Sequence, residues 1–177
     1  MALSTFSSVV IALCFAAVFV TWTTWTYFIG SIWSPMPKRA IRQMLDYAKV
    51  GGKDVVYDLG SGDGRVVIEA AKRGASAFGV EIDPLRMIFS KLMVLLHGQA
   101  GKAKIEWKNI FSKTNDPDFK KATVVTLFLM QHANDMLQDT LRSKLRKGTK
   151  VVSYIWVFKG WKPTLVDKKN MIYLYTV

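Results

Sequence analysis

The feature that most constrains the fold is a glycine-rich turn between a predicted strand and a predicted helix. Residues 54–58 are a short β-branched run typical of a buried strand, and residues 65–73 have the pattern of a helix. Between them the order D-x-G-x-G-x-G is formed by Asp58, Gly60, Gly62 and Gly64. Glycines let the backbone turn tightly and approach a ligand, which the amides at the helix start then face. The turn therefore predicts an α/β protein with a ligand site at the carboxyl end of its first strand.

The rest of the chain alternates strands with helices. Further strands are expected at residues 77–82, 104–107, 123–129 and 150–158, and a final hairpin at 164–167 and 171–177. Helices are expected at 41–48, 84–97 and 133–146. Such alternation favours a parallel sheet with helices on both faces, and the hairpin favours an antiparallel edge. The sequence therefore predicts a doubly wound, mostly parallel, seven-stranded Rossmann-like domain over residues 38–177.

The order of the glycines distinguishes three kinds of ligand loop. A dinucleotide fold needs G-x-G-x-x-G, which fails here because position 65 is arginine. A phosphate-binding loop needs Gly-Lys-Ser/Thr, which is absent from the turn. The D-x-G-x-G-x-G turn of the seven-strand S-adenosylmethionine methyltransferases fits at every position. A glycine turn without any ligand is the alternative.

The third interpretation assigns cofactor-binding roles to residues around the turn. Asp58 would help to hold the amino acid end of S-adenosylmethionine, which carries an ammonium group. Glu81, 23 residues later at the end of the next strand, would take the ribose hydroxyls. Asn109 stands after the third strand, where these enzymes often carry an acid near the adenine amino group; an ordinary loop asparagine is the alternative. The other predicted cofactor-binding residues are Gly60, Ser61, Gly62 and Asp63.

Three segments resemble a known group of enzymes: residues 55–65, residues 79–84 and residues 141–163, which end in Gly160-Trp161-Lys162-Pro163. The chain is similar there to the small archaeal protein lysine methyltransferases and to the mitochondrial ATP synthase c-subunit lysine methyltransferases. The resemblance implies S-adenosylmethionine as cofactor and a protein lysine as substrate. The chain departs from the group at Asn109 and at Pro35-Met36-Pro37, where members tend to have a more polar element.

The amino-terminal segment differs in composition from the rest. Residues 1–37 contain no charged side chain, and residues 6–28 supply the roughly 20 apolar positions that a membrane span needs. Aromatic residues gather at the end of the segment, and basic residues follow from Lys38. We therefore expect a single-pass transmembrane anchor at 1–33, a linker at 34–37, and a domain on the cytoplasmic or mitochondrial matrix side. A cleaved signal peptide and a buried core helix are the alternatives.

The formal net charge of +12 lies wholly on residues 38–177. Such a domain attracts phosphates, anionic lipid headgroups or an acidic protein face, although a solvated basic surface would have the same composition. The single cysteine, Cys14, allows no disulfide within the chain. His97 and His132 lie far apart, so we expect no metal site.

Methyl transfer is an in-line displacement at the sulfonium, and its nucleophile must be neutral and aligned. An apolar pocket favours the neutral form of an amine, and the aromatic candidates near the fifth strand are Tyr154, Trp156 and Trp161. Ordinary packing is the alternative for each of them. The Asn/Asp-Pro-Pro-aromatic element that holds planar amino groups is missing after the fourth strand, which disfavours a nucleic acid substrate.

Three functions are consistent with these features. The first is methylation of a lysine in a membrane-associated protein. The second is methylation of a lipid or lipid-soluble small molecule. The third is a non-catalytic subunit of a membrane complex that retains the fold, against which the intact Asp58, Gly60, Gly62 and Glu81 argue.

Overall fold

The computed structural model describes residues 2–28, 34–112 and 117–177, and it divides the chain into two compact units. The amino-terminal unit holds one helix, α1 (Ala2–Phe28). Within the described parts of the chain, no helix is both long and apolar enough to cross a membrane. The predicted transmembrane helix is therefore not confirmed. The uninterrupted apolar run covers only residues 9–20, because hydroxyl-bearing residues precede and follow it. Met1 and residues 29–33 of the predicted anchor lie outside the described residues.

The second unit, Ser34–Val177, is built on one seven-stranded sheet. Its strands are β1 (Val55–Leu59), β2 (Ser76–Glu81), β3 (Ala103–Trp107), β4 (Val124–Leu127), β5 (Lys150–Tyr154), β6 (Leu165–Asp167) and β7 (Ile172–Thr176). Their order is β3-β2-β1-β4-β5-β7-β6, with β7 and β6 antiparallel to their neighbours. The predicted mostly parallel, seven-stranded Rossmann-like sheet is confirmed.

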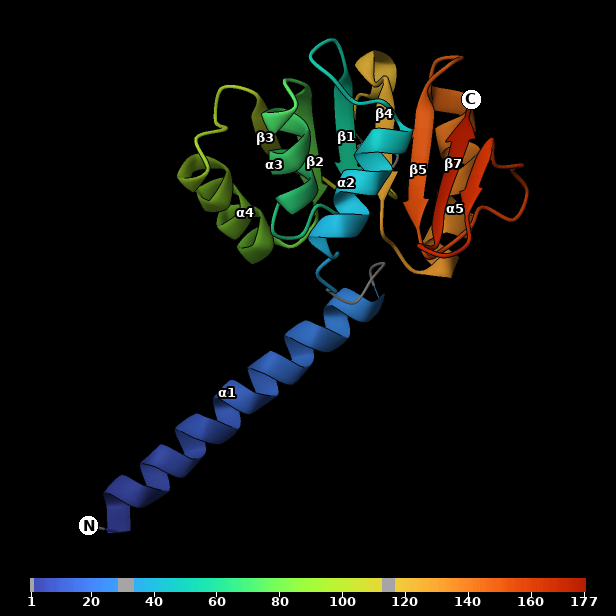
Figure 1. The fold of residues 1–177 in the computed structure, drawn as a ribbon. Coiled ribbons are helices and arrows are strands. Elements are labelled where there is room, and N and C mark those ends of the chain that lie inside the picture. Colours follow the sequence, from blue (N-terminus) through green and yellow to red (C-terminus); the bar gives the residue numbers. More distant parts are fainter. Residues whose placement is uncertain (1, 29–33, 113–116) are drawn as a thin grey trace. The chain divides into compact units, whose positions relative to one another are not determined.

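Helices cover both faces of this sheet (Figure 1). They are α2 (Lys38–Tyr47), α3 (Arg65–Lys72), α4 (Pro84–Leu96) and α5 (Gln131–Lys144), and a short 3₁₀ helix, η1 (Phe119–Lys121), precedes β4. One core cluster joins the sheet to α2, α3 and α4, and a second joins its other face to α5. Met36, from the predicted linker, is buried in the first cluster, so residues 34–37 are partly packed against the domain.

Predicted and observed elements differ most at the fifth strand. The apolar run predicted a strand to residue 158, whereas β5 ends at Tyr154. Ile155 has a φ of 67°, in the left-handed region that a β-branched residue rarely adopts. The chain therefore leaves the sheet in a turn, in which the Ser153 hydroxyl and the Asn134 side-chain amide both donate to the Trp156 carbonyl.

Candidate active site

Two acids lie at the carboxyl ends of neighbouring parallel strands. Asp58 is the fourth residue of β1, and Glu81 ends β2. The strand register pairs Asp58 with Gly79, two residues before Glu81, which brings both carboxyl groups to one edge of the sheet. Each residue is only 4% exposed. A buried carboxylate is costly unless something binds it, so this edge is suited to a ligand that carries positive charge or hydroxyl groups.

The carboxyl group of Asp58 has one hydrogen-bond donor on the neighbouring strand. Thr126 is aligned with Asp58 in the β1–β4 pair, and its hydroxyl donates to Asp58 Oδ1 at 2.7 Å. Burial raises the pKa of Asp58 to about 7, against the lowering effect of the Thr126 hydrogen bond; Asp63 and Glu81 raise it further. Near neutral pH this group is therefore poised between its acid and its carboxylate forms, and a bound cation would favour the carboxylate.

Glu81 fixes the glycine-rich turn to the end of β2. Its Oε2 accepts a hydrogen bond from the Gly62 amide at 2.8 Å, and its Oε1 accepts from the Ile82 and Asp83 amides at 2.9 Å each. Burial raises the pKa of Glu81, and these backbone donors act in the opposite direction. The sequence pointed to Glu81 as a ligand for ribose, but its structural role in holding the loop was not anticipated.

The turn itself is folded tightly against β2 and β4. The amides of Gly60 and Ser61 both donate to the Val80 carbonyl, and Gly60 has a φ of 77°. A Cβ atom on Gly60 would lie 2.7 Å from a methyl group of Leu129, so only glycine fits this position. Ser61 Oγ is buried without a hydrogen-bond partner among the described residues, a polar atom left for a ligand or water.

Asp63 is less available than the sequence suggested. Its carboxylate forms an ion pair with Arg65, whose Nε lies 2.8 Å from Asp63 Oδ1. Arg65 Nη1 also donates to the Met36 carbonyl at 2.9 Å. The two side chains thus connect the start of α3 to the segment before α2. No local pattern indicates this connection, because Met36 and Arg65 are 29 residues apart.

Asn109 lies just beyond β3, and its side-chain oxygen is already engaged. Asn109 Oδ1 accepts a hydrogen bond from the Phe111 amide at 2.9 Å, which closes a local turn. Nearby, the Trp107 indole donates to the Ile82 carbonyl at 2.8 Å. The predicted hydrogen bond from the adenine amino group to Asn109 would therefore share an oxygen that already accepts one.

The three aromatic candidates for a substrate pocket do not form one cluster. Tyr154 packs edge to face on Phe128, with ring centroids 4.9 Å apart, in the core cluster on the side of α2. Trp161 packs on Phe158 and Tyr175 in the cluster on the side of α5. Trp156 stands in the turn after β5 and is 36% exposed. Of the three, Trp156 alone combines exposure with a position at the carboxyl edge of the sheet.

Two further residues shape this edge and were missed by the sequence analysis. Thr126 lies within a predicted apolar strand, although it is the single polar side chain in β4. Asn134, on α5, is fully buried, and its Nδ2 donates to Ser153 Oγ and to the Trp156 carbonyl at 3.1 Å each. For Thr126 the available signal was a polar residue within a run of apolar ones, whereas Asn134 lies in a largely polar stretch and has no such signal.

The chemistry of this edge fits S-adenosylmethionine. Asp58 is suited to an ammonium group and Glu81 to hydroxyl groups, and the unpaired Ser61 Oγ lies in the turn between them. The glycine at position 79 leaves the space that Ser61 occupies, because a Cβ there would lie 2.7 Å from Ser61 Oγ. The residues present therefore form a narrow cradle with donors and acceptors on both sides.

Comparison with known proteins gives consistent matches. Residues 58–165 match the model of the ANTKMT methyltransferase domain. A protein-lysine N-methyltransferase of Saccharolobus islandicus is 40% identical over 151 residues, which cover 81% of this chain and 91% of that protein. The ATP synthase c-subunit lysine N-methyltransferase of Rattus norvegicus is 32% identical over 61% of this chain and 48% of that protein.

A solved structure supports the same fold and cofactor. It is described as an RNA methyltransferase from Salinibacter ruber in complex with S-adenosyl-L-homocysteine. It is 37% identical and superposes with a TM-score of 0.76, covering 81% of this chain and 94% of that one. S-adenosylhomocysteine is the product that remains when S-adenosylmethionine has given up its methyl group.

Proposed function

Because this chain belongs to the family of ANTKMT methyltransferase domains, we propose that it transfers the methyl group of S-adenosylmethionine to the amine of a protein lysine. The observation that carries the proposal is the pair of buried acids, Asp58 and Glu81, on either side of the glycine-rich turn. The lysine substrate is supported by the relative that is 40% identical over most of the chain and is named a protein-lysine N-methyltransferase.

Each residue of the edge has a proposed role. Asp58 accepts hydrogen bonds from the ammonium group of the cofactor, and Glu81 accepts them from the ribose hydroxyls. Gly60, Ser61 and Gly62 let the backbone approach the cofactor closely. Asp63 contributes through the Arg65 ion pair, which fixes the start of α3. Asn109 is proposed to lie near the adenine.

The reaction needs a neutral lysine beside the sulfonium. A new N–C bond forms as the C–S bond breaks, the electron pair of that bond leaves with sulfur, and a proton is lost from nitrogen to solvent. Deprotonation of a lysine with an ordinary pKa near 10.4 costs about 4.6 kcal/mol at pH 7. An apolar wall lowers this cost because it disfavours the ammonium form. Trp156, exposed in the turn after β5, is the proposed wall, and Tyr154 is the buried last residue of that strand.

A membrane location is part of the proposal. Residues 1–37 carry no charge, and large apolar side chains of α1 such as Phe6, Leu13 and Phe15 are 64% to 73% exposed. Such a helix is suited to a lipid environment, and the basic residues from Lys38 onward favour the cytoplasmic or matrix side for the domain. A methyltransferase held there would act on membrane-associated proteins, whose effective concentration the anchoring raises.

The test is to identify the substrate class directly. The purified full chain is incubated with S-adenosylmethionine labelled in its methyl group and with membranes of its own organism, which are then separated into protein, lipid and RNA. We expect label in protein, and N-methyl-lysine after acid hydrolysis. The Asp58→Asn variant, which keeps the side-chain shape, should give at most about one-tenth of that label.

The other functions make different predictions in the same experiment. Label in lipid would support the small-molecule alternative, and label in RNA would support an activity like the one by which the Salinibacter structure is described. Either result, with unlabelled protein, would contradict a lysine methyltransferase. A chain that binds S-adenosylhomocysteine but labels none of the three fractions would behave as a non-catalytic subunit.

A further inference from the structure

Helix α4 carries an apolar stripe that faces away from the domain. The stripe is formed by side chains that are 49% to 69% exposed: Leu85, Ile88, Phe89, Leu92, Leu95 and Leu96. Their spacing of three and four residues places them on one side of the helix. The opposite side buries only Ser90 and Val94 against the sheet. Soluble proteins rarely expose a contiguous apolar surface of this kind unless something binds it.

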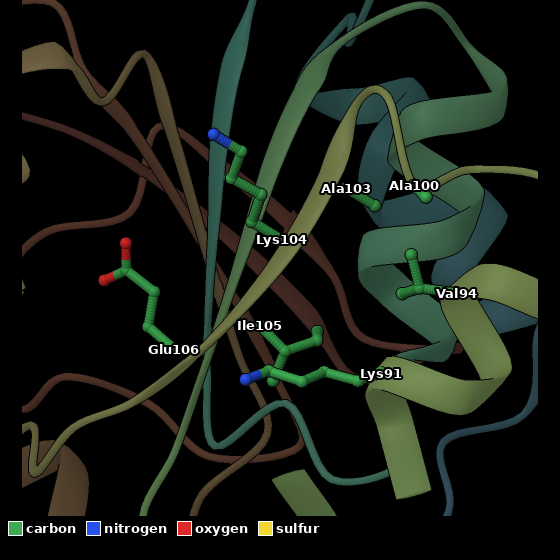
Figure 2. Close-up of a pocket in the computed structure, with 7 residues that line it drawn as sticks. All are labelled: Lys91, Val94, Ala100, Ala103, Lys104, Ile105 and Glu106. Carbon is green, nitrogen blue, oxygen red and sulfur yellow. The ribbon is translucent and has the colours of Figure 1, made fainter. Parts of the chain in front are cut away.

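A basic residue borders the stripe on the side of β3. Lys91 reaches from α4 toward β3 and lines a pocket of about 340 Å³ between the helix and the strand (Figure 2). Lys104 also lines this pocket, but its side chain extends from β3 away from α4. Glu106 also lines this pocket, but it forms an ion pair with Lys108 at 2.9 Å. Across residues 84–108 there are five lysines and arginines and one acid, a net charge of +4.

An exposed tryptophan stands at the start of the same helix. Trp107, the last residue of β3, is 61% exposed. Its indole nitrogen donates a hydrogen bond to the carbonyl of Ile82, and Ile82 lies two residues before the start of α4. Tryptophan prefers the boundary between lipid and water, where its ring is in an apolar layer and its nitrogen is hydrogen-bonded. The stripe, the basic border and the tryptophan are therefore the features of a helix that lies in a membrane interface.

We propose that α4 docks the domain onto the surface of an anionic lipid bilayer. The stripe enters the outer part of the apolar layer, while Lys91, beside the stripe, contacts the lipid phosphates. A second copy of the chain is a poorer occupant, because a symmetric pair would bring together two copies of a segment, residues 84–108, whose net charge is +4. Helix α1 is also a poorer occupant, because it offers no charge to Lys91. Of these three occupants, an anionic bilayer is the one that supplies both an apolar layer and negative charge.

Docking would orient the active site. Helix α4 begins directly after Glu81 and Asp83, at the edge of the sheet where the buried acids lie. A bilayer under α4 would therefore hold the cofactor-binding edge next to lipid, within reach of lysines near the membrane surface. The inference concerns a lipid surface alone, so it does not depend on the identity of the methylated substrate.

A local fluorescent probe tests the contact in the full chain. Cys14 is the only cysteine and is replaced by serine, so that a single new cysteine at Leu92 can carry an environment-sensitive dye. The matched control places the dye at Asp139, an exposed residue of α5, the helix on the other face of the sheet. Vesicles contain phosphatidylcholine with or without phosphatidylglycerol, and quenching is compared between nitroxide-labelled lipid chains and aqueous iodide.

With anionic vesicles we expect lipid quenching at Leu92 and about fivefold less iodide quenching there than at Asp139. Both effects should weaken with neutral vesicles and in high salt. The double variant Ile88→Glu with Leu95→Glu should abolish lipid quenching at Leu92. The control pair Met136→Glu with Val166→Glu, also at exposed apolar positions, should leave it unchanged.

Two results would overturn the proposal. Equal iodide quenching at Leu92 and Asp139 on anionic vesicles would show that α4 stays in water. Protection of Leu92 in the absence of vesicles would show that another copy or α1 covers the stripe. Affinity for S-adenosylhomocysteine, measured on every variant, verifies the fold, and none of these readouts requires methyl transfer to lysine.

Discussion

Protonation of Asp58 should control cofactor binding in mildly acidic solution. The proposed partner of Asp58 is an ammonium group, which needs the carboxylate form, whereas burial raises the pKa of Asp58 in the free enzyme to about 7. If the bound carboxylate stays ionised, the dissociation constant scales with one plus the ratio of protonated to ionised Asp58. Between pH 7.5 and pH 5.5 that factor rises about 25-fold, equivalent to roughly 1.9 kcal/mol of binding free energy.

Titration calorimetry with S-adenosylhomocysteine measures this effect directly. Affinity should fall as the pH is lowered from 7.5 to 5.5, and two buffers of different ionisation enthalpy should reveal about half a proton released per ligand at pH 7. Thr126→Val removes the hydrogen bond that lowers the pKa of Asp58, so the midpoint should move to higher pH. Asp58→Asn should bind weakly and lose the pH dependence.

A matched control separates this effect from general acid sensitivity. Asp54 lies just before the amino end of β1, where it accepts hydrogen bonds from Gly51 and Thr123. Asp54→Asn should keep the wild-type dependence of affinity on pH. An affinity that is flat from pH 5.5 to 7.5, or a slope that survives in Asp58→Asn, would refute the assignment of Asp58 to the ammonium group.

Three further predictions concern the same edge of the sheet. Gly79→Ala places a Cβ 2.7 Å from Ser61 Oγ, so urea unfolding should show a loss of about 1–3 kcal/mol, whereas Gly101→Ala, which has open space, should change little. In Glu81→Gln, the side-chain amide cannot accept hydrogen bonds from all three backbone amides that Glu81 binds. Calorimetry should therefore show at least roughly tenfold weaker binding of S-adenosylhomocysteine. Near-wild-type affinity would contradict the role of Glu81 in the cofactor site. The pKa of Asp58 is raised on folding, so its contribution to stability is lost as pH rises from about 4 to 7. In urea unfolding, the free energy of unfolding of the wild type should therefore be roughly 2–3 kcal/mol lower at pH 8 than at pH 5 because of this residue, and Asp58→Asn should remove that decrease. The same decrease in Asp58→Asn would contradict the buried environment of Asp58.

Local sequence patterns were sufficient to predict most of the fold. The β-branched run before the glycine-rich turn predicted β1 within one residue at each end, and the helix expected at residues 84–97 was predicted with its correct start, Pro84. Asp83 caps that helix by accepting hydrogen bonds from the Leu85 and Arg86 amides. These features depend on neighbours within a few residues, and so a pattern in the sequence carries them.

Features that depend on strand register could not be predicted in this way. Thr126 reaches Asp58 only because β4 lies beside β1, and the two residues are 68 positions apart. The end of β5 was also unpredictable, because the left-handed turn at Ile155 is held by Asn134 from α5. The apolar residues after Tyr154 predicted a longer strand, since a local pattern contains no information about a distant donor.

The orientation of α4 shows a third kind of limit. Nine of the twelve positions from Leu85 to Leu96 are apolar and they extend around both sides of the helix, so hydrophobic periodicity does not show which side is buried. In the structure, the small residue Ser90 and Val94 face the sheet and let the helix pack closely on the edge strand β3 and on its neighbour β2. A helix at the end of a sheet has few neighbours on its outer side, so the larger side chains there stay exposed. An excess of apolar residues on such a helix therefore indicates a second apolar phase, which for this basic surface we infer to be lipid.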